Sequence, residues 1–146
     1  MKKSAKNFFS KEEEREIIDA IKKAEKRTSG EIRVHVENYS KDDVFERAIY
    51  WFKKLGMHKT EQRNGVLFYI AIDARKFAIL GDVGINQKVP DGFWEEIKDV
   101  MAENFKKGEF KNGVVKGILM AGEQLKKYFP YQKNDKNELD DEISYN

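Results

Sequence analysis

The stretch Val66-Leu67-Phe68-Tyr69-Ile70-Ala71-Ile72 is the longest uninterrupted apolar run in this chain of 146 residues, and it decides the fold class. A run that is apolar on both faces is typical of a central strand covered by helices on each side, and it is far too short to span a membrane. After a link of four residues, Phe77-Ala78-Ile79-Leu80 begins a second strand. Because so short a link permits only a hairpin, we predict that these two strands are antiparallel.

Upstream of this hairpin, apolar and polar side chains alternate over residues 32–37, with Arg33, His35 and Glu37 on the polar face. This alternation predicts a half-buried strand near an edge of the sheet. An apolar stripe over residues 44–55 predicts a helix between this strand and the apolar run. A helix that joins two strands of one sheet makes them parallel through a right-handed crossover.

Periodic apolar residues indicate three further helices, over residues 11–28, 93–105 and 112–129, and a capping box at Ser10 and Glu13 opens the first. The order α-β-α-β-β-α-α places helices before, between and after the strands. We therefore predict an α/β fold, a three-layer α/β/α sandwich with a small mixed β-sheet. The expected boundaries are an N-terminal segment 1–9, a domain 10–130 and a polar, acidic, loosely attached tail 131–146.

The composition excludes several classes of site and partner. The chain has no cysteine, which excludes disulfides, thiolate zinc sites, iron–sulfur clusters and cysteine nucleophiles. Its 28 basic and 26 acidic residues give a net charge of +2 that is not concentrated, so we expect a solvated surface and no nucleic-acid patch. No basic-then-apolar leader opens the chain, and no apolar stripe is left over once the core is assembled. We therefore expect a cytoplasmic monomer without a transmembrane segment.

The strand directions predict that the segments richest in glycine and carboxylates meet at one edge of the sheet. The starts of the two parallel strands lie at the same end as the finish of the antiparallel strand. We therefore expect Glu31, Asp82 and Asp91 to come together as metal ligands. The residues expected to support them from the loops are Ser29, Gly30, Asn64, Gly65, Gly81, Gly84 and Asn86. An oxygen-only set of this kind suits Ca²⁺, with Mg²⁺ as an alternative, better than zinc or copper.

Each member of this set also has a simpler interpretation. A role as cap of the following helix would by itself explain Asp91. Glu31 could be a solvated loop carboxylate, and the glycines could serve turns. The sequence alone leaves these alternatives open.

Catalytic candidates are weaker. His35 and His58 lack a ligand partner at helical spacing and are expected to be solvated. Asp73 and Arg75, in the hairpin at the opposite end of the sheet, could bind a substrate, although a turn with a local ion pair is the simpler interpretation. Residues 135–142 have the composition of a calcium loop but lack glycine at the sixth position, so we reject that site. The chain contains no Gly-x-Ser-x-Gly elbow and no phosphate loop.

Five short sequence stretches occur in order along the chain and together form one pattern. They are Thr28-Ser29-Gly30-Glu31-Ile32-Arg33-Val34, Asn64-Gly65-Val66-Leu67, Gly81-Asp82-Val83-Gly84-Ile85-Asn86, Pro90-Asp91-Gly92-Phe93-Trp94 and Gly108-Glu109-Phe110-Lys111-Asn112-Gly113. Each is weakly specific, but the ordered set, which covers about residues 8–130, resembles the TPM-domain family, once catalogued as a domain of unknown function. The resemblance is greatest to its short bacterial stand-alone members.

This resemblance implies an α/β/α sandwich that binds divalent cations, calcium above all, in loops at one edge of the sheet. The residues that match the family's metal loops are Gly81, Asp82, Gly84 and Asp91, with Glu31 and Asn64 on the neighbouring loops. Thylakoid-lumen relatives are described as acid phosphatases, whereas other members look like binding modules or accessories of membrane complexes. Many relatives carry a signal peptide or membrane helix, which puts an exported or tethered role in doubt for this sequence.

Two functions follow from the resemblance. The first is a calcium-binding module without chemistry of its own, acting through a protein partner. The alternative is a metal-assisted acid phosphatase, in which the cation polarises a phosphoryl oxygen and activates water. A third role for the cation is purely structural, holding the long loop 81–92 in place.

Overall fold

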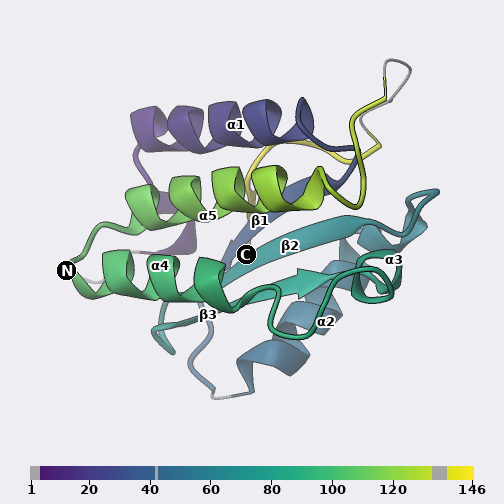
Figure 1. The fold of residues 1–146 in the computed structure, drawn as a ribbon. Coiled ribbons are helices and arrows are strands. Elements are labelled where there is room, and N and C mark those ends of the chain that lie inside the picture. The colour runs from purple at the N-terminus through teal and green to yellow at the C-terminus, as the bar shows by residue number, and fades with distance from the viewer. Residues whose placement is uncertain (1–3, 42, 133–137) are drawn as a thin grey trace.

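The structure, a computed structural model, describes residues 4–41, 43–132 and 138–146 (Figure 1). The described helices and strands run from a short 3₁₀ helix near the N-terminus to a short C-terminal strand. Their bounds are η1 (Ala5–Asn7), α1 (Lys11–Glu25), β1 (Glu31–Glu37), α2 (Val44–Lys54), η2 (Met57–Lys59), β2 (Gly65–Ala71), β3 (Lys76–Gly81), α3 (Val83–Asn86), α4 (Glu95–Lys106), α5 (Phe110–Leu125) and β4 (Ser144–Tyr145). None of the helices in these described ranges is long and apolar enough to cross a membrane.

The four strands form one sheet in the order β3-β2-β1-β4. β1 and β2 are parallel, with Glu31 opposite Gly65 and Glu37 opposite Ala71, whereas β2 and β3 form an antiparallel hairpin. Both strand directions confirm the predictions from the sequence. β4 adds a short parallel pairing to the other edge of β1.

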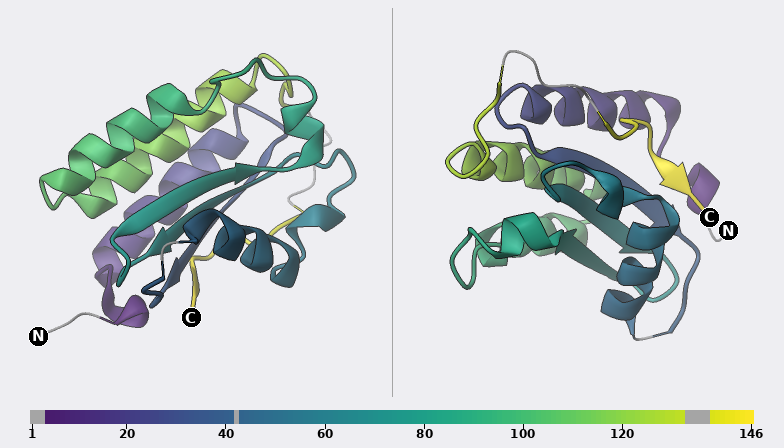
Figure 2. Two further views of the ribbon diagram at one scale, coloured as in Figure 1. Left: turned by 90° about the horizontal axis from the view of Figure 1, so that it is seen from below. Right: turned by 90° about the vertical axis from the view of Figure 1, so that its right-hand side faces the viewer.

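Helices cover both faces of the sheet (Figures 1 and 2). On one face, α1, α4 and α5 pack against side chains such as Val34 and Phe68. On the other face, α2 packs against the intervening side chains, including Leu67 and Tyr69. The apolar run therefore alternates between two cores, which explains why it is apolar throughout. The architecture is the predicted three-layer α/β/α sandwich.

The prediction that β1 is half-buried is wrong, whereas its predicted place near an edge of the sheet is correct, because among the described strands only the two-residue strand β4 lies outside it. His35 and Glu37 are both buried, and β1 lies between β2 and β4. The ring of Trp51, on α2, stacks on the His35 ring at a centroid distance of 4.1 Å. The polar face of this strand is thus covered by α2 and carries buried polar groups where the alternation indicated solvent.

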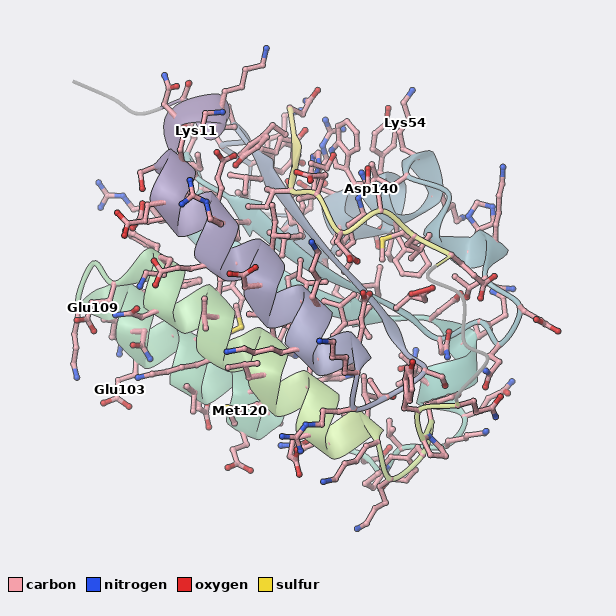
Figure 3. The ribbon with its side chains drawn as sticks, turned by 90° about the horizontal axis from the view of Figure 1, so that it is seen from above. Lys11, Lys54, Glu103, Glu109, Met120 and Asp140 are labelled. Atoms are coloured by element: carbon pink, nitrogen blue, oxygen red, sulfur yellow. The ribbon has the colours of Figure 1, made fainter. Side chains whose placement is uncertain are left out.

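The C-terminal segment is docked on the sheet, which corrects the prediction of a loosely attached tail for its described part. Ile143 is buried, and the backbone N–H of Asn146 donates to the carbonyl oxygen of Val36 at 3.0 Å. In return, the N–H of Asn38 donates to the carbonyl oxygen of Asn146 at 3.2 Å. Figure 3 shows this segment, with Asp140 labelled, running beside the sheet between α1 and α2. We call residues 138–146 the C-terminal strap.

The helix boundaries differ from the predicted ones mainly around residues 81–92. The predicted loop contains the short helix α3, and the next helix begins at Glu95, with Trp94 as its N-cap. Asp91 therefore does not cap α4. The predicted capping box of α1 is confirmed, because the Ser10 hydroxyl accepts from the N–H of Glu13 and the Glu13 carboxylate accepts from the N–H of Ser10.

Candidate functional site

Three loops meet at the edge of the sheet where β1 and β2 begin and β3 ends, near α3 (Figure 1). The N–H of Glu31 donates to the carbonyl oxygen of Asn64 at 3.2 Å, and the N–H of Asp82 donates to that of Gly65 at 2.9 Å. Two side-chain amides add to these backbone bonds, since Asn64 donates to the Ser29 carbonyl oxygen at 3.1 Å and Asn86 to that of Gly81 at 3.0 Å. The strand directions thus bring these loops together, and their amides join them.

One glycine in this edge is required by close packing. A Cβ atom on Gly84 would lie 2.2 Å from the backbone oxygen of Gln62, so α3 can approach the preceding loop only with glycine at this position. The N–H of Gly84 uses this proximity to donate to the carbonyl oxygen of Arg63 at 2.9 Å. In contrast, a Cβ atom on Gly30 would make only ordinary contacts, the nearest at 3.5 Å.

The carboxylate of Asp82 is buried and fully engaged. Arg63 donates to it through Nε at 2.7 Å and through Nη2 at 2.9 Å, and the N–H of Val83 donates to it at 2.8 Å. These bonds raise the pKa of the Arg63 guanidinium above its usual value. The Arg63 side chain is 45% exposed, so the arginine closes the outer side of the site and covers Asp82 from solvent.

Glu31 lies in a different part of the same edge, among other acidic groups. It is buried and accepts a hydrogen bond from the N–H of Glu138, in the C-terminal strap. Burial raises the pKa of Glu31 to about 7. Nearby, burial and a hydrogen bond with Asp141 raise the pKa of Glu25 to about 9, and Glu25 also accepts from the N–H of Ile32 at 3.1 Å. The strap therefore docks beside two carboxyls, Glu31 and Glu25, whose pKa values are raised to about 7 and about 9.

Asp91, the third predicted ligand, is exposed. It lines an open surface hollow together with Arg27 and Lys127, which follow the ends of α1 and α5. Across the described ranges, no group of three or more histidine, aspartate or glutamate side chains is arranged to hold a metal ion. The three predicted carboxylates thus occupy three separate environments and do not form a ready ligand set in this conformation.

A second polar cluster, which the sequence analysis missed, surrounds Glu37 at the other end of β1. Its carboxylate accepts from the Arg47 guanidinium, from the Trp51 indole at 2.9 Å and from the Tyr69 hydroxyl. The side-chain amide of Asn146 also donates to it, at 3.1 Å. Burial opposes ionisation of Glu37, but these hydrogen bonds outweigh it and lower the pKa of the carboxyl. A carboxylate so saturated holds α2 and the strap to the sheet and has no lone pair to offer a substrate.

His35 belongs to the same buried region. Its Nδ1 lies 2.9 Å from the hydroxyl oxygen of Ser144, and its Nε2 is buried without a hydrogen-bond partner among the described residues. Burial lowers the pKa of His35 to about 4, so its ring is neutral at physiological pH. The prediction that His35 is solvated is therefore wrong. The only sequence signal was the spacing of Arg47 and Trp51, which lie four residues apart and so share one face of α2.

Comparison with known proteins identifies relatives of this architecture. A family model described as the TPM domain matches residues 3–124. The BA42 protein of the psychrophilic bacterium Bizionia argentinensis, solved by NMR, is 50% identical, with a TM-score of 0.90 over 95% of this chain and 96% of that chain. No curated protein matches the chain.

Two more distant solved structures share the fold. The N-terminal domain of a protein from P. gingivalis is 17% identical, with a TM-score of 0.69 over 87% of this chain and 83% of that one. The N-terminal domain of the cg2496 protein from Corynebacterium glutamicum is 14% identical, with a TM-score of 0.62 over 80% and 73%. The domain match over residues 3–124 and the 50% identity to a protein of nearly equal length show that the chain belongs to the TPM-domain family.

Proposed function

We propose that this protein is a divalent-cation-binding module that takes Ca²⁺, and less readily Mg²⁺, at the loop edge and acts through a protein partner. The observation that supports it is the buried carboxylate of Asp82 at the junction of three loops joined by hydrogen bonds. Backbone carbonyls and a carboxylate at such a junction are the hard oxygen ligands that Ca²⁺ prefers.

In this proposal, Arg63 and the cation compete for Asp82. The guanidinium already neutralises the carboxylate through two hydrogen bonds, so a cation has to displace it. The partial exposure of the Arg63 side chain allows it to turn outward into water when the cation binds. Glu31 is a candidate for the same cation only after it has lost its proton, since its pKa is raised to about 7.

The test is a backbone-amide NMR titration with CaCl₂ and then MgCl₂. We expect saturable shifts near Glu31, Asn64 and Asp82, their loss in Asp82→Asn, and tighter binding in Arg63→Gln because the competing cation is removed. Asp99→Asn, which removes an exposed carboxylate on α4, is the matched control and should bind as the parent does. An absence of shifts at millimolar calcium refutes the proposal, and unchanged binding in Asp82→Asn refutes Asp82 as a ligand.

A metal-assisted acid phosphatase is the second candidate, because the TPM-domain family that the chain matches is also named for a phosphatase. Hydrolysis of p-nitrophenyl phosphate, measured with calcium and with EDTA, distinguishes the two functions. Calcium-dependent turnover that is lost in Asp82→Asn supports the phosphatase. Binding without turnover supports the module, and a rise in Tm without any change in partner capture indicates a purely structural cation.

The proposal also includes a monomeric state and a cytoplasmic location. Sedimentation equilibrium with and without calcium measures the first, and cell fractionation measures the second. A calcium-dependent increase in molecular mass would indicate that the protein partner is a second copy of this chain.

A further inference from the structure

A pocket of about 650 Å³ opens between the β2–β3 hairpin, the α4–α5 turn and the N-terminal segment. We call it the hairpin pocket, and its apolar lining includes Ile70, Phe77, Phe105 and Phe110. The hairpin joins the end of β2 to the start of β3, at the opposite end of the sheet from α3 (Figure 1). The pocket, which the hairpin lines, therefore lies at the opposite end of the sheet from Asp82, the N-cap of α3. It belongs to neither the loop edge nor the Glu37 cluster.

Aromatic rings form the wall of the hairpin pocket. The centroids of Phe77 and Phe105 are 5.0 Å apart at an interplanar angle of 75°, and those of Phe105 and Phe110 are 5.4 Å apart. Phe8 closes the other side, with its ring centroid 5.0 Å from that of Phe110. Phe110 is still 37% exposed, so part of this aromatic surface faces solvent. Rings held in place by one another give a preformed apolar surface that a ligand need not order.

The charged residues that line the hairpin pocket are all basic. They are Arg75, Lys76 and Lys106, and no acidic side chain lines the pocket in the described ranges. Within those ranges, neither Arg75 nor Lys106 forms an ion pair with a carboxylate. Arg75 has φ of 56°, in the left-handed region. The turn therefore sets the direction in which the Arg75 side chain leaves the hairpin backbone. The pocket therefore combines an apolar interior with a positive rim.

We propose that the hairpin pocket binds a small monoanionic amphiphile of the medium-chain carboxylate type. Its apolar body packs among the phenylalanine rings, and its carboxylate pairs with Arg75 and Lys106. The volume lies within the range of about 300–1,000 Å³ that small-molecule sites occupy, and a few charged groups beside an apolar lining are the usual composition of such sites. The single sign of the rim selects an anion, and the arginine fork suits a carboxylate.

The probes are sodium decanoate and 1-decanol, which share an apolar body and differ in charge. Both are titrated below their aggregation limits into the full chain, in EDTA, and binding is followed by backbone-amide NMR. The EDTA separates this test from the cation proposal, which can fail without affecting it. We expect saturable decanoate shifts confined to residues around Phe77, Ala102 and Phe110, and at least tenfold weaker binding of decanol.

Three variants locate the two parts of the site. Arg75→Gln combined with Lys106→Gln should weaken decanoate by about tenfold and change decanol by less than twofold, because it removes only the charge. Ala102→Leu, which adds bulk to a half-buried lining position, should weaken both probes. Arg27→Gln combined with Lys127→Gln, at a separate surface hollow, is the control for lost charge and should change neither.

The proposal is overturned by any of three results. They are shifts that do not saturate or that spread over the surface, decanol binding as tightly as decanoate, and an Ala102→Leu chain that keeps parental affinity. Near-parental spectra of each variant away from the pocket confirm that it is folded, so a loss of binding reports on the site.

Discussion

Glu37 holds more polar contacts than any other single carboxylate described in the core, although it stands on a strand whose alternation suggested solvent. Arg47 shields it, and Arg47 itself lies over the Tyr50 ring, 4.6 Å from the centroid. A carboxylate buried in this way is tolerated only while its donors remain in place. The stability of the α2 layer therefore depends on individual hydrogen bonds as well as on apolar burial.

Removing the guanidinium tests this dependence. We expect Arg47→Met to lower the free energy of unfolding by about 3 kcal/mol, because it leaves the buried Glu37 carboxylate with an uncompensated charge. The same substitution at Arg27, whose pair with Glu123 is exposed, should cost less than about 1 kcal/mol. Urea unfolding of both variants at pH 7 makes the comparison, and equal losses would show that Glu37 does not depend on Arg47.

At the scale of the element, α3 is positioned by a contact between backbones. Gly84→Ala places a methyl group against the Gln62 carbonyl oxygen, which cannot move without displacing the loop before β2. We expect a loss of about 2 kcal/mol, in the range of overpacked sites. Gly30→Ala, in a neighbouring loop with ordinary contact distances, should cost less than about 1 kcal/mol. Thermal and urea unfolding measure both, and a mild effect of Gly84→Ala would mean that α3 can lift away.

The C-terminal strap is the second element whose role can be measured. Ile143→Ala should cost about 2 kcal/mol, because it empties a buried position between the strap and the core. Leu119→Ala, on α5 with 39% of the residue exposed, is the matched control and should cost less than about 1 kcal/mol. Hydrogen exchange at the Asn38 and Asn146 amides, which bond across the strap, should accelerate only in Ile143→Ala. Equal costs in the two variants would show that Ile143 stabilises the fold no more than an exposed leucine does.

At the scale of the whole molecule, the buried ionisable groups set the dependence of stability on pH. Glu25 releases its proton near pH 4.5 in the unfolded chain but near pH 9 in the folded one, and Glu31 does so near 4.5 and 7. The unfolded state therefore binds fewer protons between these values, so stability falls as pH rises through this window. His35 acts in the opposite sense, since its folded pKa of about 4 lies below 6.5 and stability falls as pH drops between them.

The effects of His35 and of the two carboxyls on stability oppose each other below pH 6.5. Above pH 6.5, we expect only Glu25 and Glu31 to change stability with pH. We expect Glu25→Gln, which imitates the protonated acid, to match the parent near pH 5 and to exceed it in unfolding free energy at pH 8.5. Glu103→Gln, an exposed residue of α4, should track the parent at both values. The measurement is urea unfolding of each variant at both pH values. If the unfolding free energy of Glu25→Gln changes with pH as that of the parent does, the pH dependence belongs to other groups.

The sequence was sufficient for the parts of this molecule that rest on local patterns. The double-faced run at Val66 predicted the three layers, and the short link after it predicted the hairpin. The alternation in β1 predicted a solvated face, which is wrong because Glu37 and His35 face α2 and the strap. These partners are distant in sequence, so the residues of β1 alone could not predict them. For the candidate site, strand direction predicted the meeting of loops, whereas the Arg63–Asp82 pair and the contact of Glu31 with the strap depend on side-chain placement.

The pairing of β4 with β1 also has a consequence for synthesis on the ribosome. His35 and Ser144 touch although 109 residues separate them, so β1 is translated long before the strand that completes its outer edge. During that interval, the nascent chain presents an unpaired strand edge and a carboxylate that still lacks Asn146, one of its donors. Unpaired edges are sites of aggregation, so the emerging chain should depend most on chaperones in the interval before residues 144–146 leave the exit tunnel.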